Sequence, residues 1–282
     1  MKLSEALALA SEKLSTAGVP SPQADATWLL CHILDTDRSD LLTRITFGQD
    51  LSSEQLEAFL VALARREKRE PLQHITGKAA FRSLELSVGP GVFIPRSETE
   101  QVVQYAIDYL RQLPRPGVAI DLGTGSGAIA IAMAVEVPQA KVYAVELSQS
   151  AFNYATKNIE ANLAAVELRL GAMQEVVSDL VGGVDVVISN PPYIPDSAIP
   201  IDPEVRNFDP ELALYGGEDG LDVIRDISGI AAALLRVGGL LVLEHAETQS
   251  DAIRELLLND GWLSVSAFQD AAMRYRTITA IR

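Results

Sequence analysis

From residue 117 onward, short apolar runs alternate with helix-length segments. This order is typical of a doubly wound, mainly parallel sheet with helices on both faces. The last two runs have no room for a helix between them, so they predict an antiparallel pair. We expect seven strands, near residues 117–121, 141–146, 166–170, 184–189, 239–244, 262–269 and 275–281.

The first 75 residues have a different pattern, that of successive helices. Gly18–Pro22 separates two predicted helices, and Ser52 with Gln55 forms a capping-box pattern that opens another. Apolar alternation over 80–88 then predicts a short hairpin. We therefore predict three parts: a small all-α N-terminal domain over 1–75, a linker with a β-hairpin over 76–92, and the α/β domain over 93–282.

Composition excludes several classes of protein. Cys31 is the sole cysteine, so no intramolecular disulfide can form, and with three histidines in the chain no metal site is expected. No stretch approaches the roughly 18 apolar residues of a membrane span, so a membrane partner is not expected. The N-terminus lacks a signal-peptide pattern, and a cytoplasmic location is the expectation.

The net charge of −15 is a poor match for a nucleic acid backbone, and most of it lies beyond residue 75. We therefore expect no direct nucleic acid partner. Plain solubility explains such a charge, although a basic protein partner would also be attracted. The mixed-sign run Arg65–Glu70 is typical of a solvated helix face.

A glycine-rich turn follows the first predicted strand and precedes a helix. Residues 121–127 read Asp-Leu-Gly-Thr-Gly-Ser-Gly. Glycines let the backbone approach a bound cofactor closely, and the helix N-terminus faces that cofactor. Asp121 would repel a diphosphate, whereas the sulfonium of S-adenosyl-L-methionine tolerates a carboxylate. The motif favours this methyl donor, and a nicotinamide dinucleotide remains an alternative.

Glu146 ends the next predicted strand. It lies roughly 20 residues after the glycine turn, where an acidic residue suits the ribose hydroxyls of either cofactor class. Glu146 therefore supports nucleoside binding without choosing between the two cofactors.

Asn190-Pro191-Pro192-Tyr193 follows the fourth predicted strand. Two prolines remove two N–H donors, so their carbonyls accept without a competing donor beside them. Asn190 adds a side-chain amide, and Tyr193 adds a flat face. Such a corner can hold a planar NH2 group by both hydrogens, and a proline-stiffened turn is the other interpretation. Because ligands bind at the carboxyl ends of strands in open α/β sheets, we expect this corner near the glycine turn.

The chain resembles the HemK/PrmC family, whose members methylate the Gly-Gly-Gln glutamine of peptide chain release factors. The resemblance covers nearly the whole chain and implies the S-adenosylmethionine-dependent methyltransferase fold. The Asn-Pro-Pro-Tyr motif alone is shared with nucleic-acid adenine methyltransferases, whereas 93–100 together with 216–221 is more specific. The matching segments are Pro71–Gly77, Phe93–Glu100, Asp121–Gly127, Asn190–Ile194 and Ala213–Leu221.

The resemblance implies roles for the residues that match. Glu146 would hold the cofactor ribose, and Met173 would pack on the adenine, where Gly171–Met173 lacks the acidic residue that the family commonly offers. Asn190, Pro191 and Tyr193 would be catalytic, and Pro192 would also bind substrate. The remaining cofactor-binding positions are Asp121, Gly123, Thr124, Gly125, Ser126, Gly127 and, at the boundary with the substrate, Asn190.

The resemblance thus implies an S-adenosylmethionine-dependent protein-glutamine N-methyltransferase that acts by direct in-line transfer. Class 1 release factors are the expected partners of a monomeric enzyme whose helical domain docks them. A nucleic-acid adenine methyltransferase is the alternative, and Ala172 with Met173 keeps open a cofactor-binding protein that has lost catalysis. His74 and His245 are interpreted as structural.

Two further segments are given roles, the first by the same resemblance and the second by its length. Residues 93–100 would form a wall over the cofactor, shaped by Arg96 or Glu98. The long stretch 195–217 would border the substrate entrance.

Overall fold

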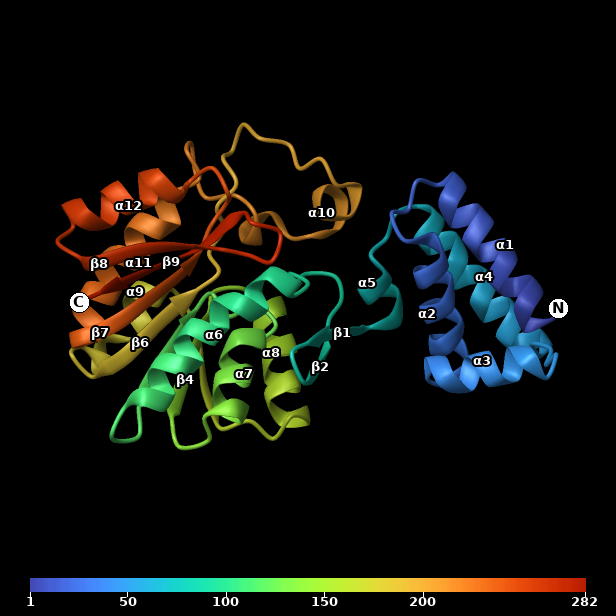
Figure 1. The fold of residues 1–282 in the computed structure, drawn as a ribbon, viewed down its shortest axis with the longest axis horizontal. Coiled ribbons are helices and arrows are strands. Elements are labelled where there is room, and N and C mark those ends of the chain that lie inside the picture. The colour runs from blue at the N-terminus through green and yellow to red at the C-terminus, as the bar shows by residue number, and fades with distance from the viewer. The chain divides into compact units, whose positions relative to one another are not determined.

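The computed structural model describes residues 1–282 and divides the chain into two compact units (Figure 1). The first unit comprises Met1–Lys78 together with Pro200–Phe208. The second comprises Ala79–Ile199 and Asp209–Arg282. The chain therefore passes from the second unit into the first and back again within the stretch that follows Asn190–Tyr193.

The first unit is helical. Phe59, Leu29 and Leu30 are fully buried at its centre. The predicted capping box is present: the Ser52 hydroxyl accepts from the Gln55 N–H at 3.1 Å, and Gln55 Oε1 accepts from the Ser52 N–H at 3.0 Å. The helices are α1 (Leu3–Thr16), α2 (Pro22–Leu34), α3 (Arg38–Thr46), α4 (Ser53–Glu67), α5 (Leu72–Thr76) and α10 (Pro203–Phe208).

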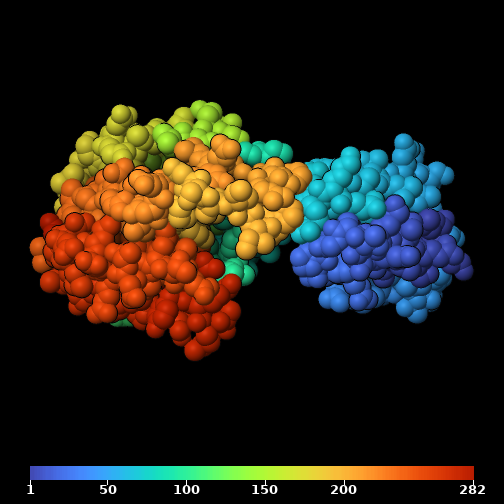
Figure 2. Space-filling view, turned by 90° about the horizontal axis from the view of Figure 1, so that it is seen from above, coloured from blue at the N-terminus to red at the C-terminus, as the bar shows by residue number.

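The charged run at the end of α4 is not wholly solvated. Arg66 is only 5% exposed and donates to Asp25 and to Glu204, both at 2.7 Å. Arg69 also donates to Glu204, at 2.6 Å. The prediction of a solvated face is wrong for Arg66, because Glu204, from a segment far along the chain, binds its guanidinium. Atoms of that later part of the chain, coloured orange, lie against the cyan atoms of the helical unit (Figure 2).

The second unit is built on a seven-stranded sheet, which confirms the predicted fold class. The strand order is β5-β4-β3-β6-β7-β9-β8, and a separate two-stranded sheet pairs β1 with β2 in the region of the predicted hairpin. The strands are β1 (Lys78–Phe81), β2 (Leu84–Ser87), β3 (Val118–Leu122), β4 (Lys141–Glu146), β5 (Val166–Leu170), β6 (Val184–Ser189), β7 (Leu235–Glu244), β8 (Leu263–Gln269) and β9 (Tyr275–Ile281).

Strands β3 to β7 run parallel, and β9 pairs antiparallel with both β7 and β8. The predicted antiparallel pair at the end of the chain is therefore confirmed. Strand β7 begins at Leu235, four residues before the predicted start at 239. Leu235 pairs with Val184, and the register shifts between Val184 and Val186, so the early part of β7 is irregular.

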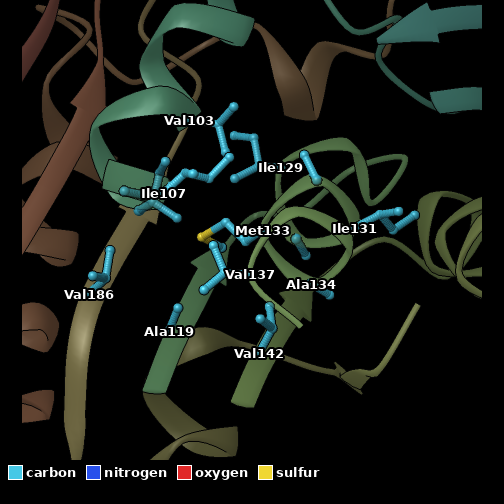
Figure 3. Packing of buried hydrophobic residues seen from close by; sticks show 14 of the residues in the cluster. Val103, Ile107, Ala119, Ile129, Ile131, Met133, Ala134, Val137, Val142 and Val186 are labelled. Carbon is cyan, nitrogen blue, oxygen red and sulfur yellow. The ribbon is translucent and has the colours of Figure 1, made fainter. Parts of the chain in front are cut away.

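Helices cover both faces of the sheet. On one face, Val103 and Ile107 of α6 and Met133 of α7 pack against Ala119 and Val186 (Figure 3). Residues that alternate with these along the strands, such as Ile120 and Val187, pack on the other face against α11 and α12. The helices of this unit are α6 (Ser97–Gln112), α7 (Ala128–Glu136), α8 (Gln149–Ala161), α9 (Met173–Val176), α11 (Asp222–Leu234) and α12 (Ser250–Asn259).

The topology places two strand ends side by side. Strands β3 and β6 are direct parallel neighbours, with Asp121 opposite Ile188. At their carboxyl ends, the Ser189 hydroxyl donates to the Leu122 carbonyl at 2.6 Å. The segments that begin at Gly123 and at Asn190 therefore leave the sheet next to each other. None of the helices combines the length and the apolar character that a bilayer crossing needs.

Candidate active site

The glycine turn begins where β3 ends. The N–H groups of Gly123 and Thr124 both donate to the Val145 carbonyl at 2.9 Å, which ties the turn to β4. Gly123 and Gly125 have φ angles of 75° and 57°, and a Cβ on either would meet no atom within 4 Å. Glycine is therefore required here for its backbone conformation, and the space in front of both residues is open.

Two buried side chains support this turn from below. Asp121 is fully buried, and its Oδ2 accepts from the Thr124 hydroxyl at 2.5 Å. Its Oδ1 is buried without a hydrogen-bond partner. Burial raises the pKa of Asp121 to about 7. The Ser126 side chain is also buried, and its backbone carbonyl accepts from Asn158 at 2.9 Å.

Glu146 lies at the end of β4 with both carboxylate oxygens engaged. Its Oε2 accepts from the Gly125 N–H at 2.8 Å, and its Oε1 accepts from the Ser148 N–H at 2.7 Å. A carboxylate oxygen has two lone pairs, so each can accept one further hydrogen bond. Met173 opens α9 after β5 and is half-buried, packed partly against the core on that face of the sheet.

The Asn190–Tyr193 corner begins where β6 ends. The side-chain N–H of Asn190 donates to the Thr99 hydroxyl at 3.3 Å, and that hydroxyl donates to Glu244 Oε2 at 2.6 Å. This leaves Asn190 Oδ1 without a partner in the chain. The corner therefore presents an acceptor, because the donor side of the amide is already used.

The backbone of the corner is held from behind by residues 214–220. The Ile194 N–H donates to the Leu214 carbonyl at 2.8 Å, and the Gly216 N–H donates to the Ile194 carbonyl at 2.9 Å. A Cβ on Gly216 would lie 2.5 Å from the Pro192 carbonyl, and one on Gly220 would lie 2.4 Å from the Tyr193 carbonyl. Only glycine permits this close approach of the two backbones.

Tyr193 is half-buried beside the same network. Its backbone carbonyl accepts from Gln249 Nε2 at 2.9 Å. Burial, helped by the negative charge of Glu244, raises the pKa of Tyr193 to about 12. Its phenol therefore stays neutral at physiological pH. Burial likewise raises the pKa of Glu244 to about 7, against the hydrogen bond from Thr99.

Segment 93–100 lies at the start of α6 and makes two ion pairs. Arg96 contacts Asp209 at 2.7 Å, and Glu98 contacts Arg274 at 3.1 Å. His245 is fully buried, and its Nδ1 lies 2.8 Å from the Ala246 carbonyl. His74 belongs to the helical unit, where its ring lies edge-on to the ring of Phe208 with 6.5 Å between the ring centroids.

The structure thus brings Gly123, Gly125, Glu146 and Asn190 to one edge of the sheet. It also assigns contacts to residues for which the sequence predicted no role of their own. Thr99 and Gln249 each bond the corner directly, and Glu244 contacts it both through Thr99 and by a hydrogen-bond interaction with the Asn190 side chain. For the backing of the corner, the sequence offered one signal, the pair Gly216 and Gly220. Two glycines indicate a close backbone approach, but they do not identify the segment that is approached.

Comparison with known proteins identifies methyltransferase domains in this chain. The PrmC N-terminal domain model matches residues 5–77, and the methyltransferase small domain model matches residues 84–202. A methyltransferase structure from Pyrococcus furiosus shares the fold, with 23% identity and a TM-score of 0.51 over 82% of this chain and 98% of its own.

Curated relatives extend the match over the full length. The release factor glutamine methyltransferase of Streptomyces coelicolor is 47% identical over 97% of this chain and 96% of its own length. That of Mycolicibacterium smegmatis is 45% identical over 100% of this chain and 98% of its own. Identity of this extent, together with both domain matches, confirms the resemblance noted in the sequence: the chain belongs to the release factor glutamine methyltransferase family.

Proposed function

We propose that this chain transfers a methyl group from S-adenosyl-L-methionine to a glutamine side-chain nitrogen, that of the Gly-Gly-Gln motif in class 1 peptide chain release factors. Family membership supports the reaction class, and the names of the curated relatives support the substrate. The observation that carries the proposal is the unpartnered Oδ1 of Asn190 on the strand beside the glycine turn.

The glycine turn fits the cofactor. Gly123 and Gly125 leave open space in front of the backbone, and the buried Oδ1 of Asp121 lacks a partner beneath it. A cationic ligand suits that carboxyl group, whereas a diphosphate does not. Glu146 retains lone pairs for the two ribose hydroxyls, and Met173 offers an apolar contact for adenine.

The corner fits a carboxamide NH2 group. Asn190 offers Oδ1, and Pro191 offers a backbone carbonyl that has no N–H beside it, since Pro192 follows. Each acceptor takes one hydrogen of the substrate amide. Because both are held by the strand end and by residues 214–220, the nitrogen is oriented before reaction.

The reaction then depends on the placement of the substrate nitrogen more than on proton transfer to a protein side chain. When bound, S-adenosyl-L-methionine would supply an electrophilic methyl group, which would pass in line from sulfur to the amide nitrogen. Asn190 and Pro191 stabilise the positive charge that develops on the amide nitrogen. One N–H proton leaves to water afterwards, so no general base is required. The neutral phenol ring of Tyr193 packs on the amide plane.

Segments on either side of the corner complete the site in this proposal. Residues 93–100 form a wall over the cofactor, fixed by the Arg96–Asp209 and Glu98–Arg274 ion pairs. Stretch 195–217 borders the substrate entrance, because it begins two residues after Tyr193.

The helical domain, residues 1–75, serves in this proposal to dock the protein substrate. Phe47 is 84% exposed and Trp28 is 50% exposed, which is unusual for large aromatic side chains. Phe47→Ser should raise KM for a whole release factor while leaving transfer to a short Gly-Gly-Gln peptide unchanged. An equal KM for the whole factor would remove Phe47 from the docking surface.

The test is methyl transfer from labelled S-adenosyl-L-methionine to a purified release factor, beside a variant with its Gly-Gly-Gln glutamine replaced by alanine. Label on the first alone supports the proposal. Label on DNA or RNA instead would favour the adenine alternative, since the Asn-Pro-Pro-Tyr corner serves both. Cofactor binding without label on any acceptor would favour a chain that has lost catalysis.

A further inference from the structure

The side chain of Asn190 has two ends of opposite character. A carboxamide presents an oxygen that accepts and an NH2 group that donates, and rotation by half a turn exchanges them with little change in shape. Only one of the two orientations serves a substrate amide, because a substrate NH2 group needs an acceptor. Something in the fold must therefore select that orientation.

Thr99 supplies the selection at the first step. Its hydroxyl accepts from the Asn190 N–H at 3.3 Å, so the amide is turned with its NH2 group toward α6. A hydroxyl, however, can either donate or accept. Thr99 alone would therefore tolerate both orientations of Asn190.

Glu244 removes that ambiguity. Its Oε2 accepts the single hydroxyl proton of Thr99 at 2.6 Å, which leaves Thr99 only lone pairs to offer Asn190. With Asn190 reversed, two oxygens would face each other without a proton between them, and leaving a buried polar group unpaired is unfavourable. Thr99 and Glu244 are 4% and 2% exposed, so water cannot substitute for either partner.

The network joins helix α6 to the ends of two neighbouring strands of the sheet, β6 and β7. Asn190 follows β6, Thr99 lies in the first turn of α6, and Glu244 ends β7. The charged groups around Glu244 are Arg276 and Glu98, of opposite sign. The Glu244 carboxyl group also has a hydrogen-bond interaction with the Asn190 side chain, which acts to lower its pKa and keeps the NH2 end of the amide on the side of Thr99 and Glu244.

We infer that Thr99 and Glu244 are positioning residues that fix the Asn190 carboxamide with its oxygen toward the substrate amide. Neither side chain touches the reacting atoms. Both act through Asn190, and the inference rests on the proposed function, which it deepens by naming what orients the substrate-binding acceptor.

The first arm of the test needs no substrate. In the ¹⁵N-labelled chain, the side-chain NH2 signals of Asn190 are assigned by their loss in Asn190→Ala. Thr99→Val, which keeps the shape and removes the hydroxyl, should speed hydrogen exchange of those signals at least about tenfold, since a lost 1.4 kcal/mol is a factor of ten. Thr99→Ser should restore the slow rate.

The second arm measures turnover on the release factor. Thr99→Val should lower kcat roughly 10- to 100-fold, because a small misplacement of a reacting group costs about that much. The Kd for S-adenosyl-L-methionine should stay unchanged, and Thr99→Ser should recover most of the rate. Thr279→Val, at another buried threonine in β9, is the matched control and should change neither exchange nor kcat.

The two arms separate the two hypotheses. If the native chain methylates no glutamine, the proposed function fails, and the exchange arm still decides how Asn190 is oriented. Equal exchange rates in Thr99→Val and the native chain would overturn the positioning role, as would equal kcat values in an enzyme that does methylate glutamine. If Thr99→Val lost cofactor binding while the control Thr279→Val kept it, the positioning role would also be overturned, because that result indicates a general structural defect.

Discussion

Glu204 accepts a hydrogen bond from the buried guanidinium of Arg66 at 2.7 Å, across 138 positions of sequence. The bond holds α10 in the helical unit, although the chain on both sides of 200–208 belongs to the other unit. The stretch that follows the Asn190–Tyr193 corner is therefore anchored at its middle. Burial acts to raise the pKa of Glu204, but hydrogen bonds from Arg69 and other neighbours outweigh it and lower the pKa to about 2.

Glu204→Gln should loosen this anchor. Arg66 would keep Asp25 as its one carboxylate partner. The free energy of unfolding of the helical unit should therefore fall by on the order of 2 kcal/mol. A group with a lowered pKa stabilises above its unfolded value and loses that effect as pH falls, so the deficit should shrink below about pH 4.5. Thermal unfolding and proteolysis of 195–217 measure it, with the exposed Glu211→Gln as control.

Asn190→Ala should remove turnover while S-adenosyl-L-methionine binding largely survives. The variant loses the acceptor for the substrate amide, but the glycine turn and Glu146 are untouched. Calorimetry for the cofactor and label transfer for turnover give the two readouts. Asn153→Ala, at an exposed asparagine of α8, should behave as the native chain, and activity retained in Asn190→Ala would refute the clamp.

Gly216→Ala should have a larger effect on kcat than on the free energy of unfolding. The added Cβ lies 2.5 Å from the Pro192 carbonyl, so either the corner or its backing must shift, by a few tenths of an ångström or more. A displacement of this kind can cost up to about 100-fold in rate. Gly229→Ala in α11 is the matched control, because its Cβ meets nothing and helix propensity should stabilise it by about 0.5–1 kcal/mol. Equal rates in the two variants would show that the backing is dispensable.

Glu244→Gln should change how stability depends on pH. Burial raises the pKa of Glu244 from 4.5 to about 7. The stabilisation of the folded state by the protonated carboxyl group is therefore fully present below pH 4.5 and is lost as pH rises through 7. The amide does not titrate. The stability of the native chain relative to the variant should therefore fall by about 3 kcal/mol between pH 4.5 and 8. Urea unfolding at both pH values measures the difference, and a constant offset would contradict a buried, titrating Glu244.

Much of the fold could be predicted from the sequence because its signals are local. The strands from 118 to 281 are apolar runs bounded by turn residues, and the capping box at Ser52 is formed by near neighbours. The adjacency of the glycine turn and Asn190 also follows from parallel topology, which brings the carboxyl ends of strands to one edge.

The sequence by itself thus determined the α/β and helical architecture, the glycine turn and the Asn190–Tyr193 corner. Only the tertiary structure decided that Arg66 is buried, since its cover comes from 200–208, and that Asn190 is oriented through Thr99 and Glu244. These contacts span 91 to 145 positions and involve single polar atoms. Periodicity records which face of an element is apolar, but it cannot record which hydroxyl or carboxylate a folded chain brings to a given amide.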